Sequence, residues 1–193
     1  MIETELKAVV DDWHARRAAV ERAGGVLTLD GTLRDRRYDT RDGRLASRDH
    51  VLRVRVFHDA SGSAQGSLEW KGPAEERDGY KLREEIGTGV DDADALVTLV
   101  EKLGYVVVRA IDREIAQYDL HDATVRFERY PRMDDLIEVE GEPAAIERAI
   151  AAIGIPRTAY TAEALPAFVR RFEARTGERA AISARDLGGA GGA

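Results

Sequence analysis

The segment VLRVRVF, residues 51–57, alternates arginine with branched apolar residues and is the clearest indication of the fold. Successive side chains of a β-strand point to opposite faces, so Arg53 and Arg55 share one face and the apolar residues beside them share the other. The polar face of an ordinary half-buried strand carries mixed polar residues, whereas this face is fully charged. The segment therefore predicts a strand with one apolar and one cationic face.

Five further segments repeat this alternation, within residues 2–8, 67–72, 80–87, 124–130 and 136–141. Their charged positions are Glu3, Glu5, Lys7, Glu69, Lys71, Lys81, Arg83, Glu85, Arg126, Glu128, Glu138 and Glu140. In an ordinary antiparallel sheet such faces point to solvent and the apolar faces form the core. Alternatively, the charged faces line the inside of a barrel, and the apolar faces pack against outer helices. Because six strands share the pattern, we favour the second interpretation.

Apolar residues at helical spacing predict four helices, over residues 10–23, 91–103, 143–153 and 162–176. The remaining segments look extended, and an Asp-Gly turn is expected at Asp30–Gly31 within residues 26–40. The strands follow one another mostly as hairpins rather than as βαβ units, which favours antiparallel closure. We predict an α+β fold, an eight-stranded antiparallel β-barrel or tunnel with a charged interior and helices packed outside.

A charged interior restricts what the barrel can bind. Unpaired charges are costly in a semi-enclosed space, so they must pair with one another or with a ligand. Clustered arginine and lysine match a polyphosphate, whose oxygens arginine binds bidentately. Clustered glutamate matches a hard divalent cation such as Mg²⁺ or Mn²⁺. A ligand that asks for both kinds of residue is a metal–polyphosphate complex.

Length and composition exclude several other classes. The 193 residues contain no cysteine, which excludes disulfide scaffolds, thiolate catalysis and cysteine-based metal centres. The net charge of −7 argues against nucleic-acid or membrane-surface partners, and no apolar run reaches the ~18 residues of a membrane span. The acidic opening MIETELK does not fit a secretory signal, so we expect a cytoplasmic protein. We expect one domain over residues 1–177 and a flexible tail over residues 178–193.

Several motifs, taken in their order along the chain, resemble a known family. Glu3-x-Glu5-x-Lys7 resembles the ExExK signature of CYTH domains, the triphosphate tunnel metalloenzymes, which include class IV adenylyl cyclases, thiamine triphosphatases and inorganic triphosphatases. Further matching motifs are Tyr38-Asp39-Thr40, Leu52-Arg53-Val54-Arg55, Lys71-Gly72-Pro73, Arg83-x-Glu85 and Glu138-x-Glu140. ExExK alone is a weak signal, and the order of the later motifs makes the resemblance specific.

The resemblance implies a role for each matching residue. The triphosphate would be held by Lys7, Arg53, Arg55, Lys71, Arg83 and Arg113. The metal ions would be held by Glu3, Glu5, Glu128, Glu138 and Glu140. Glu85 would support the metals or orient basic residues. The residues expected to take part in catalysis are Lys7, Arg53, Arg55, Lys71, Arg83 and Glu85. Two departures stand out: Glu128 replaces the family's usual aspartate, and Ile111 replaces a common lysine, for which Arg109 or Arg126 could substitute.

The predicted function is a Mg²⁺- or Mn²⁺-dependent triphosphatase that hydrolyses inorganic triphosphate or a nucleoside or thiamine triphosphate. A class IV adenylyl cyclase, which converts ATP to cyclic AMP and pyrophosphate, is the close alternative because it uses the same apparatus. A module that binds a triphosphate without turnover is the second alternative. A barrel with solvent-facing charges and a lipid inside is the third. The expected partner is a small-molecule triphosphate, and the expected state is a monomer or homodimer.

Overall fold

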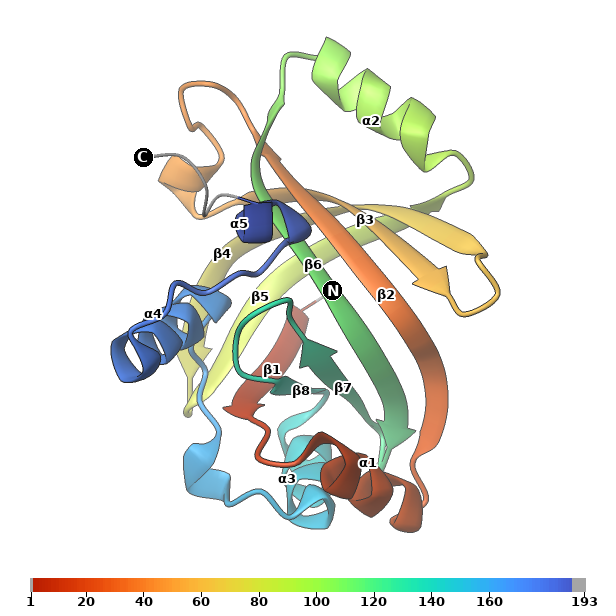
Figure 1. Cartoon of the computed structure of the whole chain (residues 1–193), viewed down its shortest axis with the longest axis vertical. Helices are drawn as coiled ribbons and strands as arrows, with labels where there is room; N and C mark the ends of the chain where they lie inside the picture. The colour runs from red at the N-terminus through yellow and green to blue at the C-terminus, as the bar shows by residue number, and fades with distance from the viewer. Residues whose placement is uncertain (1, 189–193) are drawn as a thin grey trace.

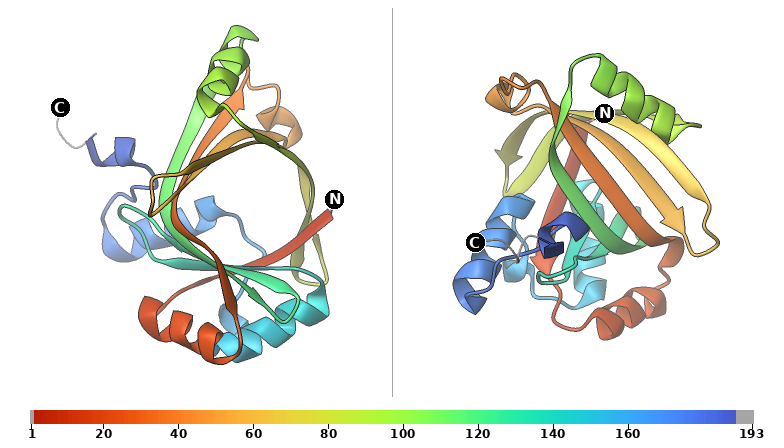
Figure 2. Two further views of the ribbon diagram at one scale, coloured as in Figure 1. Left: turned by 90° about the vertical axis from the view of Figure 1, so that its right-hand side faces the viewer. Right: turned by 45° about the horizontal axis from the view of Figure 1, so that its top comes forward.

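Residues 2–188, which the computed structural model describes, contain eight strands that close into one antiparallel barrel (Figure 1). The strands are β1 (Ile2–Val9), β2 (Val26–Asp39), β3 (Val51–Asp59), β4 (Ala64–Arg77), β5 (Tyr80–Val90), β6 (Val106–Leu120), β7 (Ala123–Arg129) and β8 (Leu136–Glu140). Their order around the barrel is β1-β5-β4-β3-β2-β6-β7-β8, and β8 pairs with β1 to close it. Figure 2 shows the ring of strands from another side. The predicted α+β barrel is confirmed.

The described residues also form helices on the outside of this barrel. They are α1 (Trp13–Arg22), α2 (Ala93–Lys102), α3 (Pro143–Ile153), α4 (Leu165–Thr176) and the short α5 (Ala184–Gly188), with 3₁₀ turns at Ala46–Arg48 and Arg157–Ala159. Aspartates fix the first two starts: Asp12 accepts a hydrogen bond from the backbone N–H of Ala15 at 2.9 Å, and Asp92 does the same for Ala95 at 2.8 Å. Among these helices, none has the length and apolar character that crossing a bilayer requires.

The largest apolar core lies outside the barrel, between α1, α3 and the outer faces of β1, β6, β7 and β8. Its members include Leu6, Trp13, Val20, Tyr118, Val125, Phe127, Ile137, Val139, Ile146 and Ile153. The rings of Trp13 and Phe127 meet edge to face, with 5.6 Å between their centroids. In a separate apolar cluster, Val100 of α2 covers the outer face of the barrel at Val54 of β3. Because helices bury the apolar faces, the charged faces of the same strands point into the barrel.

Part of the barrel interior is apolar, which the sequence analysis did not anticipate. Leu33, Phe57 and Ile115 share the inward-facing side of β2, β3 and β6 and pack together. A second apolar cluster forms where Leu165, at the start of α4, lies with the inward-facing Ile111 of β6. The charged side chains therefore occupy the rest of the lining rather than its whole length.

The dipeptide Asp30–Gly31 lies inside a strand, so the predicted turn is wrong. β2 continues from Val26 to Asp39 and pairs with β3 and β6 on its two sides. A Cβ atom on Gly31 would lie only 2.1 Å from the carbonyl oxygen of His58. Glycine is required here because β3 approaches the backbone closely, and a glycine within a strand often has this role.

The last described residues, 178–188, belong to the stretch predicted as a flexible tail, and part of this segment contacts the barrel. Ala181 is fully buried, and the backbone N–H of Asp112 on β6 donates a 2.8 Å hydrogen bond to the carbonyl of Ile182. These contacts place the segment beside β6, and its flexibility stays a prediction. The end of the predicted tail, residues 189–193, lies outside the described residues.

Candidate functional site

A cavity of about 670 Å³ lies inside the barrel, and side chains from all eight strands line it. Its wall includes every residue predicted to bind substrate or metal: Glu3, Glu5, Lys7, Arg53, Arg55, Lys71, Arg83, Glu85, Arg113, Glu128, Glu138 and Glu140. It also includes Glu69, Lys81 and Arg126, which the alternation placed on the charged faces, and Asp35, Arg37 and Asp49, to which the sequence analysis gave no role. The alternation along each strand thus brings the predicted residues together, and their individual roles stay predictions.

Asp35 on β2 holds three arginines of the cavity wall together. Its carboxylate lies 3.1 Å from Arg53, 2.9 Å from Arg55 and 3.1 Å from Arg113, and its side chain is 1% exposed. Burial opposes the charged form, but the three guanidinium groups hold the pKa of Asp35 well below its ordinary value. The sequence alone left Asp35, with Arg34, Arg36 and Arg37, open between the mouth of the tunnel and solvent. Its place two residues before Arg37 puts both on one strand face.

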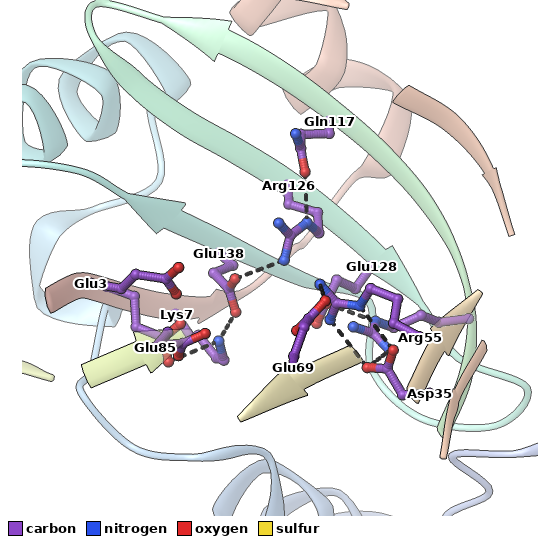
Figure 3. A network of polar contacts seen from close by, with 12 residues as sticks. Glu3, Lys7, Asp35, Arg55, Glu69, Glu85, Gln117, Arg126, Glu128 and Glu138 are labelled. Carbon is purple, nitrogen blue, oxygen red and sulfur yellow. Dashed lines mark hydrogen bonds and ion pairs between the residues drawn. The ribbon is translucent and has the colours of Figure 1, made fainter. Parts of the chain in front are cut away.

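Glu69 on β4 holds the two β3 arginines from the other side. It pairs with Arg53, lies 3.6 Å from Arg55 and accepts a 2.8 Å hydrogen bond from the hydroxyl of Ser67. Burial raises its pKa, but Arg53 and Arg55 outweigh this effect and lower the pKa of Glu69 to about 2. Figure 3 shows Asp35, Arg55 and Glu69 in one group. The β3 arginines are thus fixed in the absence of a ligand.

Glu128 on β7 is bound by other protein groups. Arg113 donates to it at 2.7 Å, and the hydroxyl of Tyr130 donates to its second oxygen at 2.6 Å. Burial raises the pKa of Glu128, but Arg113 and Lys7 lower it to about 2. Both oxygens of Glu128 are engaged, so its place in the predicted metal set requires these contacts to rearrange.

Lys7 on β1 joins the carboxylates of two strands. It stands opposite Glu138 of β8 in the strand register, forms an ion pair with it, and lies 3.2 Å from Glu5. Glu5 also pairs with Lys81 of β5. Burial lowers the pKa of Lys7, and Lys7 and Lys81 together outweigh the burial of Glu5 and lower the pKa of its carboxyl.

Glu3, Glu85 and Glu140 form the part of the lining where carboxylates face one another. Burial, a hydrogen bond with Glu85 and repulsion from Glu140 raise the pKa of Glu3 to about 8. Burial and neighbouring carboxylates also raise the pKa of Glu140. The cation on this side is Lys71, which pairs with Glu85 and lies 3.9 Å from Glu3. Its own pKa is lowered to about 8 by burial and by Arg53.

Two further cations of the cavity wall, Arg83 and Arg126, are held by different kinds of group: backbone carbonyls hold Arg83, and side chains hold Arg126. Arg83 on β5 donates to the backbone carbonyls of Gly72 in β4 and of Asp49 in the loop before β3, so its guanidinium is anchored by the backbone of both segments. Arg126 on β7, which the sequence analysis offered only as a substitute for a missing lysine, lies 3.0 Å from Glu138. It also donates to the side chain of Gln117 at 2.9 Å. Figure 3 shows Arg126 pointing toward Glu138.

The carboxylates of the lining suit a hard divalent cation by their chemistry. Carboxylate oxygens are the ligands that Mg²⁺ and Mn²⁺ prefer. The raised pKa of Glu3 reflects a crowding of carboxylates that a cation would relieve. Among residues 2–188, no group of three or more acidic or histidine side chains is already arranged as a metal cage. Glu3 and Glu140 fit such an ion by the chemistry of their carboxylate oxygens.

The charges of the cavity wall are balanced. Nine lysines and arginines and nine aspartates and glutamates line it. A polyanion that entered alone would therefore add uncompensated negative charge to a poorly solvated space. A polyanion accompanied by divalent cations would not, so the wall is better suited to a metal–polyanion complex than to a free anion or a free cation.

This fold and site define a class of protein in which a closed antiparallel barrel places both cations and carboxylates in its own lumen. The chain belongs to the CYTH domain family, whose profile matches residues 1–152. Members of that family are triphosphatases and cyclases, and the family depends on metals in general, which supports an enzymatic role. The comparison with curated proteins found no match.

Solved structures share the fold at low sequence identity. A Vibrio parahaemolyticus protein proposed to be an adenylate cyclase is 16% identical, with a TM-score of 0.73 over 88% of this chain and 98% of that chain. The Pyrococcus horikoshii protein PH1819 is 20% identical, with a TM-score of 0.70 over 84% and 94%. HpAC1 from Hippeastrum, proposed as an adenylyl cyclase but with a dominant triphosphatase activity, is 19% identical, with a TM-score of 0.62 over 88% and 95%.

Proposed function

We propose that this chain is a divalent-metal-dependent triphosphatase that hydrolyses inorganic triphosphate, or a nucleoside or thiamine triphosphate, inside its barrel. The observation that carries the proposal is the balanced lining of the cavity, in which arginines and lysines face carboxylates around about 670 Å³ of space. That volume lies in the range of small-molecule sites. The family to which the chain belongs supports the same kind of chemistry.

The arginines and lysines would bind the phosphate chain. Arg53, Arg55 and Arg113 are already positioned by Asp35, so little side-chain entropy is lost when their remaining N–H groups meet phosphate oxygens. Binding of this kind offsets the charge that otherwise repels an attacking nucleophile, and it holds the phosphorus atom in place for attack.

The carboxylates would hold Mg²⁺ or Mn²⁺, with Glu3 and Glu140 as the first donors. When bound, such a cation supplies charge stabilisation at the phosphoryl oxygens and lowers the pKa of water. Glu3 must lose its proton to bind a cation, because its pKa is raised to about 8. Glu5 and Glu138 are occupied by Lys7 and Lys81, so their predicted part as ligands requires these lysines to turn toward the phosphates.

The experiment is a product assay on the purified chain. Inorganic triphosphate, ATP and thiamine triphosphate are each supplied with Mg²⁺ and with Mn²⁺, and orthophosphate, pyrophosphate and cyclic AMP are measured. We expect orthophosphate, without cyclic AMP, and only when a divalent cation is present. Cyclic AMP with pyrophosphate would make the chain a cyclase instead. Binding of triphosphate without any product would make it a binding module.

A further inference from the structure

Arg37 on β2 differs from the other cations of the cavity wall. Within residues 2–188 every other one has an anionic partner: Lys7, Arg53, Arg55, Lys71, Lys81, Arg83, Arg113 and Arg126. The buried Nε of Arg37 has no hydrogen-bond partner in that part of the chain, although it lines the same cavity. A buried guanidinium nitrogen that lacks a partner is costly. The position is therefore suited to an anion that arrives from outside the protein.

The neighbours of Arg37 strengthen this argument. In the strand register Arg37 stands directly opposite Arg53 of β3 on one side and Arg109 of β6 on the other. Like charges in directly opposite positions destabilise a sheet. Burial and these two arginines lower the pKa of Arg37 to about 10, so it stays charged at neutral pH. The fold thus maintains a row of three cations across three strands.

The nearby carboxylates do not satisfy this row. Asp35 lies on the same face of β2, but its two oxygens already bind Arg53, Arg55 and Arg113. Glu69, which follows Arg53 across the sheet, pairs with the β3 arginines. Arg37 therefore has no carboxylate of its own within a cavity wall that is balanced as a whole. The neighbouring Arg109 is exposed and lies outside that wall, and it adds further positive charge beside Arg37.

We propose that Arg37, with Arg53 beside it in the cavity wall, forms an anion subsite that takes the free terminal phosphate of the substrate and so orients the phosphate chain. The exposed Arg109 adds positive charge next to this subsite from outside the wall. The inference rests on the proposed function and deepens it, because it limits the substrates to those with an unblocked, fully ionised phosphate end. Lys71 pairs with Glu85, lies 3.9 Å from Glu3 and is repelled by the charge of Arg53, so it stands between this subsite and the carboxylates of β1 and β5. Arg37 would contact this phosphate directly.

The test compares Arg37→Gln with Arg34→Gln. Arg34 lies on the same strand but is exposed on the outer face, which makes it a matched control. Calorimetric titration with inorganic triphosphate and Mg²⁺ measures binding whether or not turnover occurs. We expect Arg37→Gln to weaken binding about tenfold or more and Arg34→Gln to leave it unchanged. Arg37→Lys should bind with intermediate affinity, because it keeps the charge but loses the forked geometry.

The ligand-free proteins supply a second readout. Removing one of three facing cations should leave the Tm of Arg37→Gln unchanged or higher. A folded Arg37→Gln variant that binds triphosphate as tightly as the wild type would overturn the subsite and leave the proposed function standing. A variant that fails to fold would also overturn it, since Arg37 would then be a structural group. A wild-type protein that binds no triphosphate would contradict the proposed function itself.

Discussion

Asp35 on β2 and Arg113 on β6 form an ion pair inside the barrel, with 3.1 Å between Oδ2 and the guanidinium nitrogen and exposed side-chain fractions of 1% and 5%. The same carboxylate binds Arg53 and Arg55 of β3. One anion therefore fixes cations on both neighbouring strands of β2. Because these cations are the predicted phosphate ligands, the relationship couples the stability of the barrel to the arrangement of its site.

Replacing Asp35 by asparagine should destabilise the protein strongly. The change leaves three buried guanidinium groups with less compensation, and breaking a buried pair typically costs about 3–5 kcal/mol of unfolding free energy. Urea unfolding measures the loss. Asp30→Asn is the control, since Asp30 lies on the same strand and its pair with Arg17 is partly exposed, which makes it worth at most about 1 kcal/mol. Equal losses in both variants would show that the Asp35 cluster is not a structural centre.

Acid should destabilise the barrel through its buried carboxylates. The pKa values of Glu69 and Glu128 are lowered to about 2, and that of Asp35 is also lowered. Groups with lowered pKa values stabilise the fold above their unfolded values near 4 and lose that contribution as pH falls toward 2. Unfolding free energy measured from pH 7 to pH 2 should drop most steeply below about pH 4.5. Glu128→Gln should flatten part of this drop, and an unchanged profile would contradict the assignment.

Metal binding should depend on pH through Glu3. Its pKa is raised from 4.5 to about 8, so the metal-free native protein holds a proton that the unfolded chain lacks. Stability of the metal-free protein should therefore fall as pH rises between these values, and Mn²⁺ should restore it by displacing the proton. Melting curves with and without Mn²⁺ at pH 5.5 and pH 8 measure the effect, and Glu3→Gln should reduce the pH dependence. An equal Mn²⁺ shift at both pH values in the wild type would argue against Glu3 as a ligand.

The substitution Gly31→Ala should lower the stability of the β2–β3 pair. Its Cβ would meet the carbonyl oxygen of His58 at 2.1 Å, and overpacking of this kind costs roughly 1–3 kcal/mol. Gly89→Ala is the matched control in another strand, because its nearest neighbouring atom would be 4.0 Å away. Chemical denaturation of the two variants separates a steric effect from a general effect of losing glycine. A stable Gly31→Ala protein would contradict the close approach.

The strand pattern predicted most of the site because alternation specifies which face a residue shares. Glu3, Lys7 and Arg55 could be assigned to one lumen from their sequence parity, and the structure places them there. Ion-pair partners could not be assigned in this way, because the register between distant strands decides them. Lys7 faces Glu138, and Asp35 reaches Arg113, across sequence separations that no local pattern records.

One local signal was misleading. Asp30–Gly31 has the composition of a turn, but tertiary packing uses its glycine inside β2. Here a contact with a segment distant in sequence outweighs local propensity. The sequence left Arg37 open between the tunnel mouth and solvent, and the structure places it in the cavity wall, on the same face of β2 as Asp35.

The most direct test of the proposed function is orthophosphate release from inorganic triphosphate by the wild type, Arg55→Gln and the outer-face control Arg34→Gln, each with Mg²⁺ or Mn²⁺. We predict turnover by the wild type and the control only with a divalent cation, and a loss of about 10²-fold or more in kcat/KM for Arg55→Gln. Equal rates for the two variants would place the reaction outside the barrel. No release by a folded wild type that binds triphosphate would contradict the triphosphatase.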